Sequence, residues 1–257
     1  MLFLWYMIQR YFVKLSYLGT NYSGWQIQPN AISVQEVLQN ALTKLNKRES
    51  VSIMGCGRTD SGVHAENFFM HMNFEAISNL DNFIYKLNHI LPKDIVVHQI
   101  YEVPHKSHTR FDAIKRTYHY NIHFFKNPFI KSTSYLYVGE LDMDKMNDAA
   151  NILLQHINFK SFCRVKTEVK TFDCVLEEAK WIKTETGIKF IISANRFLRN
   201  MVRAIVGTMM DVGSGKLDLN EFEKIILAQD RTKAGKSAQA NGLSLVKVEY
   251  PVHLSLS

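Results

Sequence analysis

Apolar and polar residues follow two different periods along this chain, and the period changes many times between its ends. Every second position from Tyr11 to Tyr17 is apolar, which predicts a strand. Ser33 and Glu36 have the spacing of a capping box, and apolar residues at helical spacing follow in the segment Val34–Leu45. The first part of the chain is therefore expected to form a strand followed by a helix.

The same two patterns recur over the rest of the chain. Strand patterns lie at residues 51–54, 68–74, 95–101, 116–124, 174–183, 188–194 and 243–250. Helical patterns lie at residues 80–90, 143–155, 196–210 and 220–228. Elements that alternate in type in this way predict an α+β architecture. The polar, proline-containing segment at residues 103–108 predicts a boundary between two α/β halves, residues 1–105 and 106–257.

Composition limits the class of protein. The chain has 257 residues, of which 46% are hydrophobic, so it can bury a sizeable core. Its longest apolar run, Met1 to Ile8, lacks secretory-signal features and is far shorter than the roughly 20 residues of a membrane-spanning helix. A soluble, cytoplasmic protein without a membrane partner is expected. Cys56, Cys163 and Cys174 show no Cys-x-x-Cys spacing and the histidines are scattered, so neither a disulfide framework nor a metal site is expected.

The charge balance indicates a class of partner. Lys and Arg number 31 against 24 Asp and Glu, which gives a formal net charge of +7. A basic balance of this size is typical of nucleic-acid binders, although many basic proteins bind nothing specific. Whether this protein binds nucleic acid therefore has to be judged from the distribution of the charges along the chain.

The segment from Gly57 to Ala65 reads GRTDSGVHA and places Asp60 two residues after Arg58 and two before Gly62. The two glycines can adopt backbone angles closed to other residues and let a ligand approach the main chain. A carboxylate at such a loop tip, kept ionised by a nearby cation, can act as a nucleophile or a base. The alternative is an Asp-Ser-Gly turn without any chemical role.

The helical pattern at residues 196–210 has one apolar side and one basic side. The basic side carries Arg196, Arg199 and Arg203 and no carboxylate. A solvated basic face is one interpretation. The missing glutamates and Gly207, which would permit close backbone approach, favour contact with phosphates or an arginine directed at a buried acid.

A third pattern lies in the strand at residues 116–124. Period-two alternation puts Arg116, Tyr118, Tyr120 and Ile122 on one face. RNA-binding proteins use such surfaces, because unpaired bases stack on aromatic rings while arginines hold phosphates. The alternative is that these rings belong to the core or to cross-strand pairs.

Taken together and in this order, these segments resemble the tRNA pseudouridine synthase A family over nearly the whole chain. The matching segments are residues 17–26, 57–65, 87–92, 110–113, 116–120, 195–207, 212–216 and 242–250. The resemblance implies a pseudouridine synthase fold, in which two α/β halves share a mostly antiparallel sheet with helices packed on it. It also implies a basic cleft, a homodimer that grips tRNA, and no cofactor or metal.

The resemblance assigns roles to five residues at the site of chemistry. Asp60 is similar in position to the catalytic aspartate and Arg203 to the arginine that pairs with it. Tyr118 would stack on the target uracil, Arg58 would hold the flipped nucleotide, and Leu245 would form part of the apolar pocket wall. The family's reaction isomerises uridine to pseudouridine.

Further positions concern the RNA. The resemblance implies contacts to tRNA from four arginines: Arg110, Arg116, Arg196 and Arg199. The implied targets are uridines 38 to 40 in the anticodon arm. Ser107 and Gln239 stand where the family has other residues, which affects local RNA contacts rather than chemistry, and Met1 to Tyr6 precede the similar region, so Met7 is a candidate start.

Two rival functions follow from the same residues. The Asp60-Ser61-Gly62 triplet resembles the turn of aspartic proteases, but those enzymes need two such carboxylates and the chain has no second copy. A non-catalytic RNA-binding or RNA-folding module would need the basic surface but not Asp60. Replacement of Asp60 discriminates between such a module and an enzyme.

Overall fold

The computed structural model describes residues 8–165, 169–254 and 256 of the chain, so the segment Met1–Tyr6 and Met7 lie outside the described residues. The chain forms two compact units. The first contains the chain up to Ile114 and again from Lys247 onward, and the second contains Lys115–Val246. The chain thus passes between the units at two points, whereas the sequence predicted one boundary, between residues 105 and 106.

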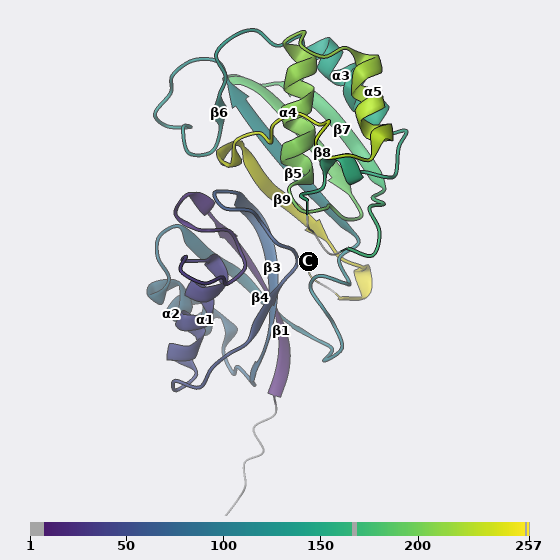
Figure 1. The fold of residues 1–257 in the computed structure, drawn as a ribbon. Coiled ribbons are helices and arrows are strands. Elements are labelled where there is room, and N and C mark those ends of the chain that lie inside the picture. The colour runs from purple at the N-terminus through teal and green to yellow at the C-terminus, as the bar shows by residue number, and fades with distance from the viewer. Residues whose placement is uncertain (1–7, 166–168, 255, 257) are drawn as a thin grey trace, which may run out of the picture. The chain divides into compact units, whose positions relative to one another are not determined.

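In the first unit, three strands, labelled in Figure 1, form an antiparallel sheet in the order β4-β1-β3. The short strand β2 pairs with β3. Two helices belong to this unit, and α2 packs against β4. The elements are β1 (Ile8–Tyr17), α1 (Val34–Leu45), β2 (Ile53–Gly55), β3 (His64–Glu75), α2 (Leu80–Ile90) and β4 (Ile95–Val103).

Strand β1 explains how this unit builds its core. Its apolar residues Tyr11, Val13 and Leu15 are fully buried, as the alternation predicted. Phe12, on the opposite face, is buried as well, because its ring packs against Tyr250 with centroids 5.5 Å apart. Both faces of this strand are therefore covered.

In the second unit the strand order is β5-β8-β7, all antiparallel, and the short β6 adds in parallel to β5. Helix α3 packs against β7, α4 and α5 (Figure 1). The elements are β5 (Lys115–His123), β6 (Tyr135–Leu136), α3 (Met143–Leu153), β7 (Leu176–Lys183), β8 (Gly187–Ala194), α4 (Met201–Gly213) and α5 (Leu219–Ala228). The last strand, β9 (Leu243–Glu249), contains the second passage between the units.

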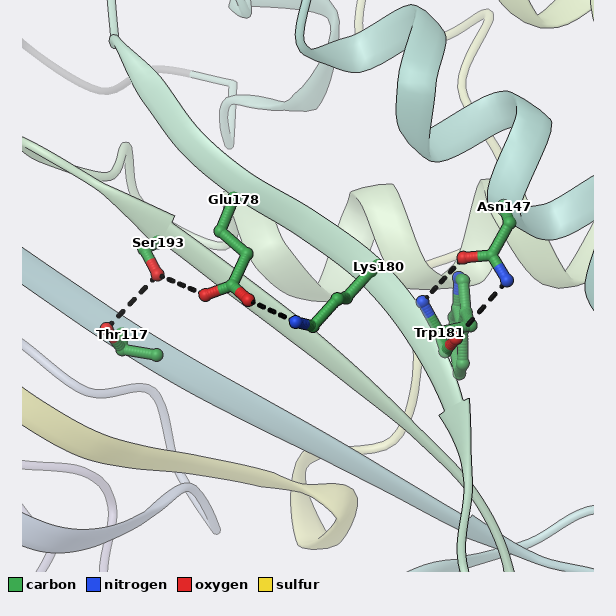
Figure 2. A network of polar contacts seen from close by, with 6 residues as sticks. All are labelled: Thr117, Asn147, Glu178, Lys180, Trp181 and Ser193. Carbon is green, nitrogen blue, oxygen red and sulfur yellow. Dashed lines mark hydrogen bonds and ion pairs between the residues drawn. The ribbon is translucent and has the colours of Figure 1, made fainter.

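Polar contacts fix the second sheet and its helix (Figure 2). Asn147 of α3 accepts a hydrogen bond from the Trp181 backbone N–H at 2.8 Å and donates one to the Trp181 carbonyl at 3.2 Å. Thr117, Ser193 and Glu178 form a chain of hydrogen bonds across β5, β8 and β7. Because Thr117 precedes Tyr118 in an extended strand, this network lies on the face of β5 opposite Tyr118.

The described elements confirm the α+β expectation. Helix α2 has the predicted bounds, and Ser33 caps α1 by accepting from the Glu36 N–H at 3.2 Å. The helix predicted at residues 196–210 is wrong at its start, since α4 begins at Met201. None of the helices in the described ranges is long and apolar enough to span a bilayer.

Candidate functional site

Asp60 lies in the loop between β2 and β3, in the first unit. The loop turns tightly after it, because the Val63 N–H donates to the Asp60 carbonyl at 3.1 Å and Gly62 has φ +79°. Asp60 is half-buried and Arg58 is exposed. Gly62 therefore supplies the left-handed conformation that the sequence predicted for this turn.

The loop at residues 22–25 holds the Asp60 turn in place through backbone contacts. The Tyr22 carbonyl accepts hydrogen bonds from the Gly62 N–H at 3.2 Å and from the Ser61 hydroxyl at 3.3 Å. The Trp25 N–H donates to the Thr59 carbonyl at 3.3 Å. Residues 22–25 thus hold the backbone on both sides of Asp60.

This support requires glycine at position 24. Gly24 has φ +86°, and a Cβ there would lie 2.3 Å from the Thr59 carbonyl oxygen. Both the backbone angle and the close approach exclude a side chain. The sequence motif at residues 17–26 therefore has a structural role that sequence reasoning did not assign to it, and its signal was the glycine that follows Tyr22 and Ser23.

Two buried side chains fix the flanks of the turn. The hydroxyls of Tyr17 and Thr59 are 3.0 Å apart, and the Gly19 N–H donates to Nδ1 of His64 at 2.9 Å. Thr59 and His64 are both buried. Because His64 Nδ1 accepts this bond, the neutral ring carries its proton on Nε2. The residues around Asp60 are consequently held in place before any ligand binds.

Gly57 differs from the sequence expectation. Its φ is not in the left-handed region, and a Cβ there would meet no heavy atom within 4 Å. The backbone geometry does not require this glycine. The open space beside it leaves room for a ligand next to Arg58.

Arg203 lies on α4, in the second unit. Its Nε donates to the Ala238 carbonyl at 2.8 Å, and its own carbonyl accepts from the Ala238 N–H at 2.9 Å. A Cβ on Gly207 would lie 1.8 Å from the Lys236 carbonyl oxygen. Gly207 thus permits the close backbone approach that the sequence predicted, and the group that approaches it is the chain segment at residues 236–238.

Arg196 and Arg199 do not lie on this helix. Asn200 has φ +64°, a left-handed conformation in the turn at residues 199–200, and α4 begins at the next residue. The Arg199 carbonyl accepts from the Arg164 N–H at 3.0 Å, and Arg196 donates to the Thr171 carbonyl at 3.4 Å. The three arginines expected on one face of a helix therefore lie in two elements: Arg196 and Arg199 in a loop, and Arg203 on α4.

The aromatic residues of β5 also divide. Tyr120 is fully buried, and its hydroxyl donates to the Gln239 carbonyl at 2.9 Å, so it belongs to the core. Burial raises its pKa well above the usual range of tyrosine. Tyr118 is half-buried and meets Phe197 edge to face, with ring centroids 5.2 Å apart. Arg116 donates to the Asn195 carbonyl at 2.8 Å.

The remaining site residues lie in both units. Leu245 on β9 is buried in the second unit. Arg110 lies in the first, with its guanidinium 5.7 Å from the centroid of the exposed Phe111 ring. In the first unit Arg58 and Asp60 share the loop between β2 and β3, and in the second the structure brings Arg203 near Tyr120 through the segment that ends at Gln239.

Potential metal ligands are dispersed over the described part of the chain. Its residues contain no group of three or more His, Cys, Asp or Glu side chains placed to hold a metal ion. The three cysteines, Cys56, Cys163 and Cys174, are buried, and none of them forms a disulfide within the described residues. Burial raises the pKa of Cys174 to about 11, which keeps this thiol protonated near neutral pH.

Comparison with known proteins identifies the family. A family model described as tRNA pseudouridine synthase matches residues 15–112 and 149–251. The chain is 49% identical to tRNA pseudouridine synthase A of Bacteroides thetaiotaomicron, over 95% of this chain and 91% of that protein. It is 48% identical to the enzyme of that name from Bacteroides fragilis, over 95% and 97%. Against the protein of that name from Bacillus licheniformis the identity is 38%, over 92% and 97%. The chain therefore belongs to the tRNA pseudouridine synthase family.

Proposed function

We propose that this protein isomerises uridine to pseudouridine at positions 38 to 40 of the tRNA anticodon arm, with Asp60 as the single catalytic carboxylate. The observation that carries the proposal is the preorganised Asp60 turn inside a family match that includes residues 15–112. The basic net charge of +7 suits a partner with a phosphate backbone.

The reaction needs no cofactor, because it rearranges atoms within one nucleotide. The bond between uracil N1 and the ribose C1′ breaks, the base turns, and a bond forms between C5 and C1′. The C5 proton is lost and N1 gains a proton, so atoms and charge balance. The enzyme has to extract the target base from its stack, retain it and exclude water.

Asp60 is the group assigned to this rearrangement. Three routes use one carboxylate: attack on the base, attack on the sugar, or assistance to a glycal intermediate. Each of them needs an ionised oxygen in a fixed place. The hydrogen bonds from Gly62, Ser61 and Trp25 that hold the turn support such fixed placement.

The other site residues are assigned supporting roles. Arg203 pairs with Asp60 and favours its ionised form. The bond from Arg203 Nε to the Ala238 carbonyl supports this role, since it fixes the plane of the guanidinium. Tyr118 stacks on the target uracil, Arg58 holds the flipped nucleotide, and Leu245 forms part of the apolar wall.

The RNA contacts and the assembly complete the proposal. Arg110, Arg116, Arg196 and Arg199 contact the phosphate backbone of the tRNA. The enzyme acts as a homodimer in the cytoplasm, where its tRNA substrate is available. A non-catalytic RNA-binding module is the alternative, and it differs in having no use for Asp60.

The test uses purified protein and an unmodified tRNA transcript, without cofactor, with pseudouridine mapped by position. We expect pseudouridine at positions 38 to 40. Asp60→Asn should bind tRNA with nearly unchanged affinity and form no product, because the amide cannot supply the negative charge. Asp81→Asn, on the exposed first turn of α2 in the same unit, is the matched control and should remain active. Product from Asp60→Asn above a heat-killed sample would refute the assignment.

A further inference from the structure

The second unit contains a cavity of about 710 Å³ that the proposed chemistry does not use. It lies at the end of β5, where the chain leaves His123 and returns through β6. Its lining includes Lys126, Lys131, Tyr135, Leu136, Gln239 and Asn241. The volume falls in the range of sites for small organic ligands, roughly 300 to 1,000 Å³.

The walls of this cavity are held by hydrogen bonds. Asn241 Nδ2 donates to the carbonyls of Lys131, at 3.0 Å, and Ser134, at 2.9 Å. The buried side chains of His123 and Ser134 are 2.8 Å apart, and the Tyr137 N–H donates to the His123 carbonyl at 2.9 Å. The loop from Lys126 to Ser134 is therefore tied down on both sides, so the cavity exists without a ligand.

The chemistry of the lining suits an anion with an aromatic part. Two lysines and no carboxylate are among the lining residues. Neither Lys126 nor Lys131 has an ion-pair partner within the described part of the chain. Tyr135 and Leu136 provide an aromatic ring and apolar surface, and the neighbouring Phe129 is 91% exposed. An aromatic side chain that is this exposed is available for stacking on a base.

We propose that this cavity receives an unpaired nucleotide of the tRNA, distinct from the uridine that is isomerised. Its base would lie against Tyr135 and Leu136, and its phosphates would lie near Lys126 and Lys131. RNA is favoured over a protein partner, because protein interfaces are depleted of lysine whereas phosphates attract it. The identity of the RNA as tRNA rests on the proposed function.

Gln239 connects the cavity with the candidate active site. It lines the cavity, its carbonyl accepts from the Tyr120 hydroxyl, and it follows Ala238, which binds Arg203. Along β5, Tyr118 and His123 are five residues apart, so their side chains lie on opposite faces of the strand, and it is Gln239, bound to Tyr120, that joins the cavity to the Tyr118 face.

The test is a matched pair of substitutions in the full-length protein, Leu136→Glu and Val138→Glu. Both add the same charge to the same stretch of chain, but only Leu136 lines the cavity, while Val138 is 87% exposed. Binding of unmodified tRNA transcript is measured by fluorescence anisotropy. Leu136→Glu should raise Kd about tenfold or more, and Val138→Glu less than about twofold, because only the first carboxylate faces the nucleotide.

A second measurement tests the lysines. Replacement of Lys126 and Lys131 by alanine should shallow the slope of log affinity against log salt by about two, one for each phosphate that a lysine no longer neutralises. Lys183→Ala combined with Lys224→Ala removes the same charge from exposed positions on β7 and α5 and should change the slope much less. Circular dichroism melting curves show whether all variants fold.

Two results would overturn the inference. Equal weakening by Leu136→Glu and Val138→Glu would make the cavity irrelevant to RNA. Sedimentation velocity measures whether the variants remain dimers. If tRNA binding is lost only in variants whose dimer dissociates, this face binds a second copy of the chain. Failure of the proposed function gives a different result. If the wild-type protein makes no pseudouridine, but Leu136→Glu still weakens tRNA binding more than Val138→Glu, the binding site stands and the proposed enzymatic activity is refuted.

Discussion

At the scale of single residues, the two glycines that flank Asp60 have different backbone conformations. Gly62 was expected in a special backbone conformation and has φ +79°. Gly57, which stands in the same motif, does not have a positive φ. The spacing of two glycines around an acid does not show which of them the turn needs. Which glycine the turn needs depends on the neighbouring loop at residues 22–25, where Gly24 approaches the Thr59 carbonyl.

Gly24→Ala tests this dependence. The substitution puts a Cβ 2.3 Å from the Thr59 carbonyl oxygen at a φ of +86°. It should lower the free energy of unfolding by about 1 to 3 kcal/mol and reduce turnover, because the Asp60 turn has to move. Gly57→Ala is the control and should change stability by less than about 0.5 kcal/mol. Urea unfolding followed by fluorescence gives both values, and equal effects would contradict the prediction.

A second residue makes stability depend on pH. His71 is buried in the first unit, and its Nδ1 accepts from the Thr109 N–H at 3.3 Å and lies 2.8 Å from the Thr109 hydroxyl. Burial, with His108 and Arg10 nearby, lowers the pKa of His71 from 6.5 to about 4. The folded protein therefore holds this ring neutral, and the unfolded chain takes up its proton first as the pH falls.

The stability that comes from His71 is thus lost as the pH falls from about 6.5 to about 4. By the linkage relation, the advantage of wild type over His71→Gln should shrink by about 2 kcal/mol between pH 7.5 and pH 5. Chemical denaturation at both pH values measures it. A difference between the two proteins that stays constant with pH would show that the His71 pKa is near its usual value.

At the scale of elements, periodicity found the elements and misplaced some ends. Phe197 and Leu198 fit the apolar stripe of the next helix, so the pattern extended that helix to Arg196. The left-handed conformation of Asn200 prevents this extension. Strand β6, with two residues, is too short to produce a pattern. On β5 the alternation grouped Tyr118 with Tyr120, but only the segment at residues 236–239, distant in sequence, decides that Tyr120 is core.

The separation of the arginines by this break leads to a testable difference. Arg199→Met removes a loop arginine that is exposed, so it should weaken tRNA binding and shallow the salt slope by about one. Turnover at saturating tRNA should persist. Arg203→Met should instead reduce turnover on bound tRNA by about a hundredfold or more, because Asp60 loses its proposed cation.

A control is needed because Arg203 also binds Ala238. Ala238→Gly leaves that carbonyl in place but loosens the segment, so it reports the structural part of the loss. Single-turnover kinetics separate binding from chemistry in all three variants. Normal single-turnover rates for Arg203→Met would mean that Arg203 only positions residues 236–238.

At the scale of the whole molecule, the α+β alternation was readable from the sequence, but the return of the chain to its first unit was not. The second passage between units lies inside β9, after Val246. A strand that contains a boundary keeps its apolar alternation and shows no change of composition. The first unit therefore includes a C-terminal segment, from Lys247 onward, that is separated in sequence from the rest of the unit by the whole second unit.

Tyr250 shows how much the first unit depends on those residues. Its hydroxyl donates to the Thr109 carbonyl at 2.7 Å, and its ring packs on Phe12 and Phe69 at 5.5 and 5.1 Å. Tyr250→Ala should lower the free energy of unfolding by about 3 kcal/mol, and Tyr250→Phe by about 1, because the second loses only the hydrogen bond. Thermal unfolding monitored by circular dichroism provides the comparison. An alanine variant as stable as wild type would show that these ring contacts are dispensable.

The late return of the chain to its first unit also sets an order of synthesis. A ribosome releases the segment with Asp60 early, but Glu249, which accepts from the Ile114 N–H at 2.8 Å, and Tyr250 leave it only after the complete second unit has been translated. Domains usually fold during translation in order from the N-terminus. Here the first unit, although its synthesis begins first, acquires its last contacts only after the second unit has been synthesised. The nascent enzyme consequently carries an unfinished first unit for most of the time that its messenger RNA is being read.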